Sequence, residues 1–217
     1  MRAGNKTCAL QRRGLTTRMR FRPVIVVPAA GPGNRFGGTL HKLLQPFGRS
    51  TVLGATLRHA IASQLPVVLV TTAQCLPLAR GMLALRDIVV LDEAEAARGV
   101  GASMAVGISE RSGAAGWLVL PGDMPLVQPD TLLAVAAALQ QHPIVYAQHR
   151  GRQGHPVAFA AELYSELIQM KSDDCARRVM LRYPAHGEDT DDSGVLMGVD
   201  TAGDLEAMRT VAERLAG

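Results

Sequence analysis

The sequence has no long run of uncharged apolar residues, and it contains only three cysteines. A membrane-spanning helix needs about 20 consecutive apolar residues, so the first absence excludes one. The longest apolar stretches, such as residues 66–70, have the length of buried strands. Cys8, Cys75 and Cys175 lie far apart and form no CxxC pair, which argues against a zinc site and against a disulfide framework. These cysteines favour a reduced, cytoplasmic compartment.

Acidic residues are missing from the first 22 positions, which carry seven positive charges. Without this basic head, the formal net charge of +4 becomes −3, with 16 basic and 19 acidic residues. A basic surface for nucleic acid is therefore not expected on residues 23–217. The head is either a targeting or anion-binding arm or a poorly ordered start, with Met19 as an alternative start, and we favour the poorly ordered start. It lacks the apolar core of a secretory signal.

Residues 23–217 are predicted to form one α/β domain, since 217 residues is the size of a single domain. Short apolar runs alternate with helical patterns of about 10–15 residues, which is typical of a mostly parallel sheet covered by helices on both faces, a three-layer αβα fold. We expect strands at residues 23–27, 66–70, 88–91, 117–120, 144–147, 157–159 and 194–199. We expect helices from 50 or 51 to 63 with Ser50 as N-cap, at 101–110, 129–141 and 204–215, and from about 162 and 173.

A glycine-rich loop, residues 28–40, directly follows the first predicted strand. Gly31 and Gly33 permit backbone conformations that aim successive N–H groups at one anion. Arg35 and Lys42 add positive charge. Ligands of parallel sheets bind beyond the carboxyl ends of the strands, so we interpret this loop as a polyphosphate site rather than a plain flexible turn.

Two common phosphate loops do not fit this segment. A P-loop requires Ser or Thr after its lysine, and Leu43 follows Lys42. The dinucleotide fingerprint requires a third glycine where Phe36 stands, and an acid after the second strand, which ends in Thr71 and Thr72. A nicotinamide-dependent oxidoreductase is therefore disfavoured.

Two acidic residues are candidates for a metal site. Asp123 lies in Gly122-Asp123-Met124-Pro125, at the end of the fourth predicted strand, where a carboxylate facing the phosphate loop holds Mg²⁺. The alternative is a turn aspartate that binds its own backbone. Asp200 follows the last predicted strand and is either a second metal ligand or the N-cap of the last helix.

Two further segments carry candidate binding residues. Gly101 and Ser103 lie where a helix opens, so that backbone N–H groups and a hydroxyl meet a base or phosphate there, or Ser103 caps the helix. Gly154 and His155 lie in a polar loop between two predicted strands. His155 is either an acceptor ligand or a turn histidine.

In their order along the chain, these segments resemble the motifs of the MobA-like NTP transferase family. The matching motifs are Ala29-Ala30-Gly31-x-Gly33-x-Arg35-Phe36-Gly37 with Lys42-Leu43-Leu44, Gly101-x-Ser103-Met104-x-x-Gly107, Gly122-Asp123-Met124-Pro125, Gly154-His155-Pro156-Val157 and Asp200-Thr201-x-x-Asp204-Leu205. The resemblance extends from about Val24 to the C-terminus. It is nearest to the CTP:molybdopterin cytidylyltransferases, since the guanylyl branch usually has glycine at the position of Ala30. Pro28 departs from the usual leucine, and the spacing from Arg35 to Lys42 is about two residues longer than usual.

The resemblance implies a fold like that of the nucleotide-diphospho-sugar transferases and the transfer of CMP from CTP to a phosphate-bearing acceptor such as molybdopterin. Pyrophosphate leaves, and Mg²⁺ is the implied cofactor. The implied roles are pyrophosphate binding by Lys42 and Arg35 with the N–H groups of Gly31 and Gly33, metal binding by Asp123 and Asp200, nucleoside contact by Ala29, Ala30, Gly101 and Ser103, and acceptor contact by Gly154 and His155.

Three alternatives stay open at this point. One is a guanylyltransferase, and another is a nucleotidyltransferase for sugar or isoprenoid phosphates. The third, from a different class, is a chaperone that carries molybdenum cofactor without catalysis. The implied partners are the nucleoside triphosphate, the acceptor and a molybdoenzyme or its chaperone, with neither nucleic acid nor membrane among them.

Overall fold

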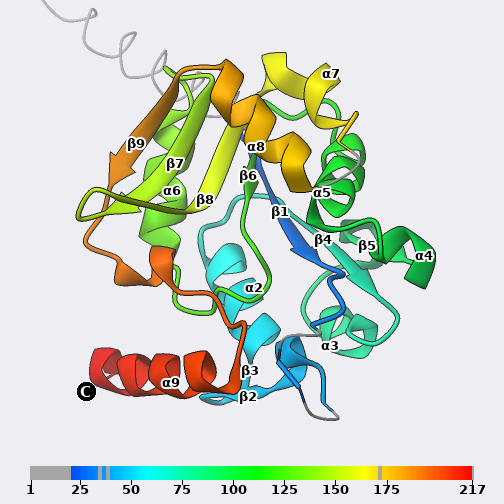
Figure 1. Ribbon diagram of the computed structural model, residues 1–217, viewed down its shortest axis with the longest axis vertical. Coiled ribbons are helices and arrows are strands. Elements are labelled where there is room, and N and C mark those ends of the chain that lie inside the picture. The colour runs from blue at the N-terminus through cyan, green and yellow to red at the C-terminus, as the bar shows by residue number, and fades with distance from the viewer. Residues whose placement is uncertain (1–20, 34–35, 38–39, 171–172, 217) are drawn as a thin grey trace, which may run out of the picture.

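The computed structural model describes residues 21–33, 36–37, 40–170 and 173–216, and its centre is a seven-stranded sheet (Figure 1). In spatial order the strands are β5 (Ile88–Leu91), β4 (Val67–Thr72), β1 (Val24–Ala29), β6 (Gly116–Val119), β8 (Arg152–Ala160), β7 (Ile144–His149) and β9 (Ala185–Asp189). β4 pairs in parallel with β1 and β5, β1 with β6, and β7 with β9. Only β8 among these described strands runs in the opposite direction, pairing antiparallel with β6 and β7. The mostly parallel α/β fold is confirmed.

Helices cover both faces of this sheet. The described helices of the chain are α2 (Val52–Ala62), α3 (Leu76–Arg80), α4 (Glu93–Ala96), α5 (Val100–Ser109), α6 (Pro129–Ala138), α7 (Tyr164–Leu167), α8 (Asp173–Arg182) and α9 (Ala202–Ala216). Short 3₁₀ turns are η1 (Lys42–Leu44), η2 (Leu85–Asp87), η3 (Ala161–Leu163) and η4 (Ser193–Leu196), and β2 (Pro46–Phe47) forms a hairpin with β3 (Ser50–Thr51). Helix α9 lies beside this β2–β3 hairpin and not on the sheet. None of the described helices is long and apolar enough to cross a membrane.

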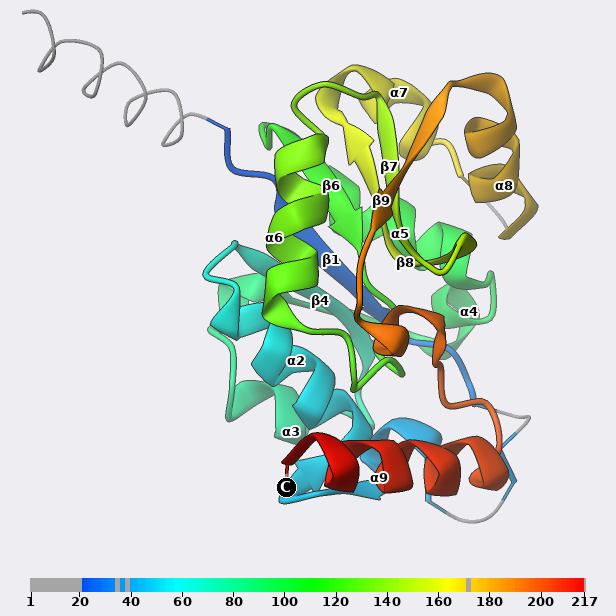
Figure 2. The same cartoon turned by 90° about the vertical axis from the view of Figure 1, so that its left-hand side faces the viewer.

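Alternate residues of β1 enter the two cores on either side of the sheet. Ile25 and Val27 are fully buried in the cluster that includes residues of α2 and α6, and Val24 and Val26 belong to the cluster that includes residues of α5. Figure 2 shows α2 and α6 on one side of the sheet and α5 and α8 on the other. Because β1 is buried on both faces, its carboxyl end is held rigidly at the centre of the molecule.

The C-terminal part differs from the sequence prediction. Residues 194–199 do not form the last strand, because η4 begins at Ser193, and the last strand is instead β9. The carboxylate of Asp192 explains the turn, since it accepts hydrogen bonds from the N–H groups of Gly194 (2.9 Å) and Gln128 (2.8 Å) and from the hydroxyl of Thr131 (2.9 Å). It thereby ties η4 to the start of α6. Strand β9 lies at the sheet edge with no fully buried residue, so its sequence carries no apolar pattern.

The structure also corrects the predicted cap of α2 and decides between the two alternatives for the cap of α9. Thr51 and not Ser50 caps α2, since the Thr51 hydroxyl accepts a hydrogen bond from Gly54 N (3.1 Å). At α9 the hydroxyl of Thr201 accepts from Asp204 N (3.2 Å), while the Asp204 carboxylate accepts from Thr201 N (2.7 Å). This reciprocal cap is made by Thr201 and Asp204, so Asp200 is not the N-cap of α9.

Candidate functional site

The glycine-rich loop is braced from within. Gly33 has a φ of +65°, a left-handed conformation that favours glycine. His41 Nδ1 accepts from Leu43 N (3.2 Å), so its Nε2 carries the proton and donates to the carbonyl of Gly31 (2.9 Å). This bond fixes the loop against η1, which begins at Lys42. Arg35 lies outside the described residues.

Lys42 reaches from η1 to the carboxyl edge of the sheet. Its Nζ lies 2.5 Å from Asp123 Oδ2, 2.8 Å from the carbonyl oxygen of Val199 and 3.2 Å from Asp200 Oδ1. The Lys42 side chain is only 13% exposed, against 22% for Asp123 and 43% for Asp200. The structure thus brings together three of the predicted site residues, from three segments that are far apart in the sequence.

The turn that carries Asp123 is held by close backbone packing. A Cβ at Gly122 would lie 3.0 Å from the Cβ of Ala29 and 3.1 Å from Leu53 Cδ1, so only glycine brings this turn so near to β1. Thr56 is fully buried in α2, and its hydroxyl lies 3.1 Å from the carbonyl oxygen of Gly122. The carbonyl of Asp123 accepts from Val199 N (2.9 Å), which ties the two acidic segments together.

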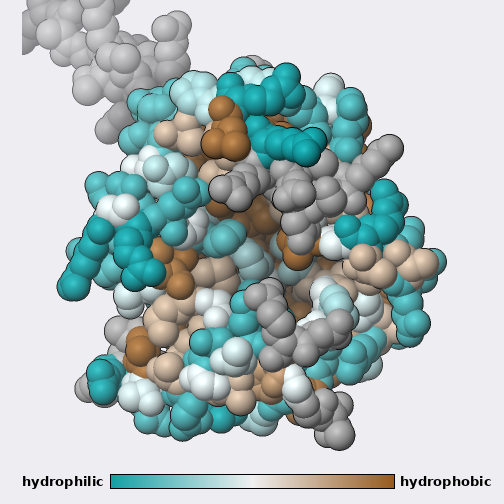
Figure 3. Space-filling model, viewed as in Figure 1, coloured by the Kyte–Doolittle hydropathy of each residue, from teal (hydrophilic) through white to brown (hydrophobic). Residues whose placement is uncertain are grey.

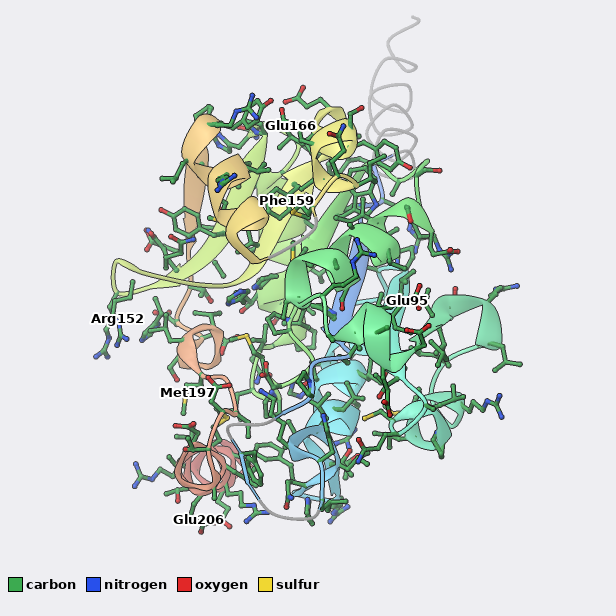
Figure 4. All side chains as sticks on the ribbon, turned by 45° about the vertical axis from the view of Figure 1, so that its right-hand side comes forward. Glu95, Arg152, Phe159, Glu166, Met197 and Glu206 are labelled. Atoms are coloured by element: carbon green, nitrogen blue, oxygen red, sulfur yellow. The ribbon has the colours of Figure 1, made fainter. Side chains whose placement is uncertain are left out.

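These residues border a cavity of about 450 Å³. Seven of the predicted site residues line it: Ala29, Gly31, Lys42, Asp123, Gly154, His155 and Asp200. The space-filling view shows this face of the molecule hollowed near its middle (Figure 3). The side chain of Arg152, also a lining residue, projects outward from the β7–β8 hairpin, and Met197 marks the segment that follows η4 (Figure 4).

His155 forms part of the far wall of this cavity. Burial lowers the pKa of His155 below 6.5, although the negative charge of Asp123 acts in the opposite direction. The ring is therefore neutral near pH 7, with one donor and one acceptor nitrogen. Gly154 has no room for a side chain, because a Cβ there would lie 2.2 Å from the carbonyl oxygen of Val195 in η4. His155 is thus presented on a strand pressed against η4.

Four other predicted site residues, all within the described ranges, do not line this cavity. Ala30 is only 2% exposed and packs in the core on the α5 side. Ser103 is buried, and its hydroxyl lies 3.4 Å from the carbonyl of Gly99, the residue that caps α5. Gly101 is buried in the first turn of α5, and Gly33 lies against His41. Their burial or packing does not favour direct contact with a nucleotide. The nucleotide contacts expected for these residues therefore stay predictions.

The groups around Lys42, at the carboxyl ends of the parallel strands, are suited to bind a cation. Within the described residues no group of three or more His, Cys, Asp and Glu side chains could hold a metal ion. Two carboxylates and a backbone carbonyl nevertheless surround the Lys42 ammonium, so the oxygens at this position already bind one positive charge. Carboxylate and carbonyl oxygens are the ligands that Mg²⁺ and similar hard cations prefer.

Two residues with a clear positioning effect were missed in the sequence. No motif in the sequence singles out His41 or Thr56. Both act through hydrogen bonds to backbone carbonyls, at Gly31 and at Gly122. A polar residue on the buried face of a predicted helix was the available signal for Thr56, while nothing local pointed to His41.

A glycine-rich turn, a lysine and acidic residues at the carboxyl edge of a mostly parallel sheet define a nucleotide-binding α/β enzyme. Residues 25–188 match the MobA-like NTP transferase domain, and the chain belongs to this family. The protein is accordingly a nucleotidyltransferase.

Solved structures and a curated relative agree with this assignment. The chain is similar to Rv0371c from Mycobacterium tuberculosis H37Rv, with 29% identity and a TM-score of 0.75 over 88% of this chain and 98% of that one. A second structure of Rv0371c, in complex with manganese, has 26% identity and a TM-score of 0.71 over 87% and 98% of the two chains. The bifunctional protein GlmU of Gloeobacter violaceus is 34% identical over 125 residues, which cover 57% of this chain and 26% of GlmU. The matched part is thus about a quarter of that relative.

Proposed function

We propose that the protein transfers CMP from CTP to a phosphate-bearing small molecule such as molybdopterin and releases pyrophosphate. The observation that carries this proposal is the meeting of Lys42, Asp123 and Asp200 beside a cavity of about 450 Å³. This volume lies within the range of about 300–1,000 Å³ that is usual for small-molecule sites.

The lining of the cavity supports direct transfer. An oxygen of the acceptor phosphate attacks the α-phosphorus, a new P–O bond forms, and the bond to pyrophosphate breaks. A phosphate monoester is largely ionised near pH 7, so the attack needs no general base. The described lining contains no serine, threonine or cysteine that would serve as a covalent nucleophile. The contribution of the protein is therefore orientation and neutralisation of charge.

The charged residues divide between the triphosphate and a metal. Lys42 and Arg35 hold the departing pyrophosphate, with help from the backbone N–H groups of Gly31. Asp123 and Asp200 hold a divalent cation, which supplies positive charge to the phosphate oxygens when it is bound. The manganese complex of Rv0371c supports a divalent cation in this family, and we propose Mg²⁺ for this protein.

The two ends of the cavity receive the two substrates. The nucleoside lies against Ala29 and Gly31 near the start of α5, and the acceptor lies against Gly154 and His155. A neutral His155 donates one hydrogen bond and accepts another, which orients a polar acceptor without adding charge. The competing reactions are the two enzymatic alternatives left open by the sequence, a transfer from GTP and a transfer to sugar or isoprenoid phosphates.

The test is pyrophosphate release from radiolabelled CTP or GTP with a panel of phosphorylated acceptors, in Mg²⁺ and in Mn²⁺. Asp123→Asn should lower the rate by at least about 10²-fold, as expected for the loss of a main electrostatic contact. The exposed Asp191 provides the matched control, and Asp191→Asn should leave the rate within about twofold. Near-normal activity of Asp123→Asn contradicts the assigned site. No pyrophosphate with any acceptor favours the non-catalytic, cofactor-carrying alternative.

A further inference from the structure

The three N–H groups of the Lys42 ammonium are all engaged at the edge of the sheet. A lysine ammonium has three donors, and the structure provides three acceptors within 3.2 Å, on Asp123, Val199 and Asp200. In this position the ammonium has no donor left for a phosphate oxygen. Lys42 therefore does not bind pyrophosphate from the position that it occupies here.

The oxygens around Lys42 are also the oxygens suited to a divalent cation. Carboxylates and backbone carbonyls bind Mg²⁺ and Mn²⁺, and the carboxylates of Asp123 and Asp200 both lie within 3.2 Å of the Lys42 ammonium. An ammonium and a metal ion a few ångströms apart repel each other strongly at a partly buried site. The two cations thus compete for one position.

The flexible side chain of Lys42 allows its ammonium to move from the carboxylates to a bound triphosphate. Its charge stands at the end of a flexible four-carbon stem, and η1 begins beside the glycine-rich loop that receives the triphosphate. A triphosphate in the cavity offers the ammonium a second set of anionic oxygens on its other side. When Lys42 moves to these oxygens, the carboxylates become available to the metal.

We propose that Lys42 occupies the metal position in the nucleotide-free protein and gives it up when the triphosphate binds. This inference rests on the proposed function, because it assigns the order in which that site receives nucleotide and metal. Metal binding without nucleotide is weak, and nucleotide and metal strengthen each other's binding by the same factor.

The test is a titration of the nucleotide-free, full-length protein with Mn²⁺, with free Mn²⁺ measured by electron paramagnetic resonance. Lys42→Met keeps the length of the side chain and removes its charge, and it should lower the Mn²⁺ dissociation constant by at least about tenfold. Equal or weaker Mn²⁺ binding by Lys42→Met overturns the proposal. Thermal unfolding confirms that the variant is folded.

Two controls make the experiment specific. Lys42→Met combined with Asp123→Asn should lose the gain in affinity, and tight binding by this double variant overturns the proposal. In the unmodified protein, saturating Mn²⁺ should raise the rate at which Lys42 is acetylated, measured by mass spectrometry against Lys6 and Lys171, the other two lysines of the chain. An unchanged rate overturns the proposal without any variant.

The two proposals fail separately. If the unmodified protein is an active transferase and Lys42→Met binds Mn²⁺ no more tightly than the unmodified protein does, then the exchange is refuted and the proposed reaction stands. A chain with no transferase activity that still shows the gain in Mn²⁺ affinity refutes the proposed reaction and supports the exchange.

Discussion

A methyl group at Gly154 should destabilise the protein strongly, because this position has no space for one. A Cβ there would lie 2.2 Å from the carbonyl oxygen of Val195, 2.7 Å from its carbonyl carbon and 3.1 Å from its Cβ. Two of these are backbone atoms, so η4 has to move away from β8. Overpacking typically costs about 1–3 kcal/mol, and a backbone obstacle places Gly154→Ala near the top of this range. About 3 kcal/mol lowers the melting temperature of a protein of this size by roughly 6–12 °C.

Urea unfolding followed by circular dichroism measures this change as a free energy, and a thermal scan gives the melting temperature. Gly113→Ala is the matched control, because no heavy atom lies within 4 Å of a Cβ built at Gly113. It should change the free energy of unfolding by less than about 0.5 kcal/mol. If Gly154→Ala costs no more than Gly113→Ala, then η4 is not pressed against β8 as described, and the argument for the placement of His155 fails.

Three further predictions concern the framework. Burial lowers the pKa of His59 below 6.5, so its neutral form adds stability above pH 6.5 that is lost as the pH falls through the folded-state pKa. His59→Gln should therefore lose less stability than the unmodified protein between about pH 7 and about pH 5 in urea titrations. Thr51→Ala should cost about 1 kcal/mol of unfolding free energy because it removes the α2 cap, and an equal loss in Ser50→Ala would refute that cap. Arg209 donates from Nη2 (2.6 Å) and Nε (3.2 Å) to the carbonyl of Pro46, so Arg209→Ala should speed hydrogen exchange in α9, and unchanged exchange would contradict this tether.

Much of the sheet was predictable because its central strands carry their own signal. β1 is buried along its whole length, and a strand with two buried faces is apolar at every position. The loop that follows β1 is identified by its glycines, and Asp123 by its place directly after another buried strand. These features depend on local sequence and on a general rule about the carboxyl ends of parallel strands.

The rest depends on contacts between segments that are distant in the sequence. The bond from Lys42 to Asp200 joins residues 158 positions apart, and no local pattern shows that the ammonium lies on the carboxylates. Strand β9 was not predicted because none of its residues is fully buried, and such an edge strand needs no alternation of apolar residues. The position of Ser103 near a helix start is visible in the sequence, whereas the approach of its hydroxyl to the carbonyl of Gly99 (3.4 Å) is not.

Because β8 runs antiparallel to its neighbours, the two sides of the site differ in how easily their loops can change in length. Lys42 and Asp123 follow strands of the parallel part of the sheet, where a shift of register would disturb the whole core. Gly154 and His155 instead stand near a tight hairpin turn, Arg150-Gly151, whose lengthening or exchange leaves the parallel strands untouched. The end of this hairpin can therefore change in length without a shift of the parallel strands, whereas Gly154, which packs against η4, cannot accept a larger residue.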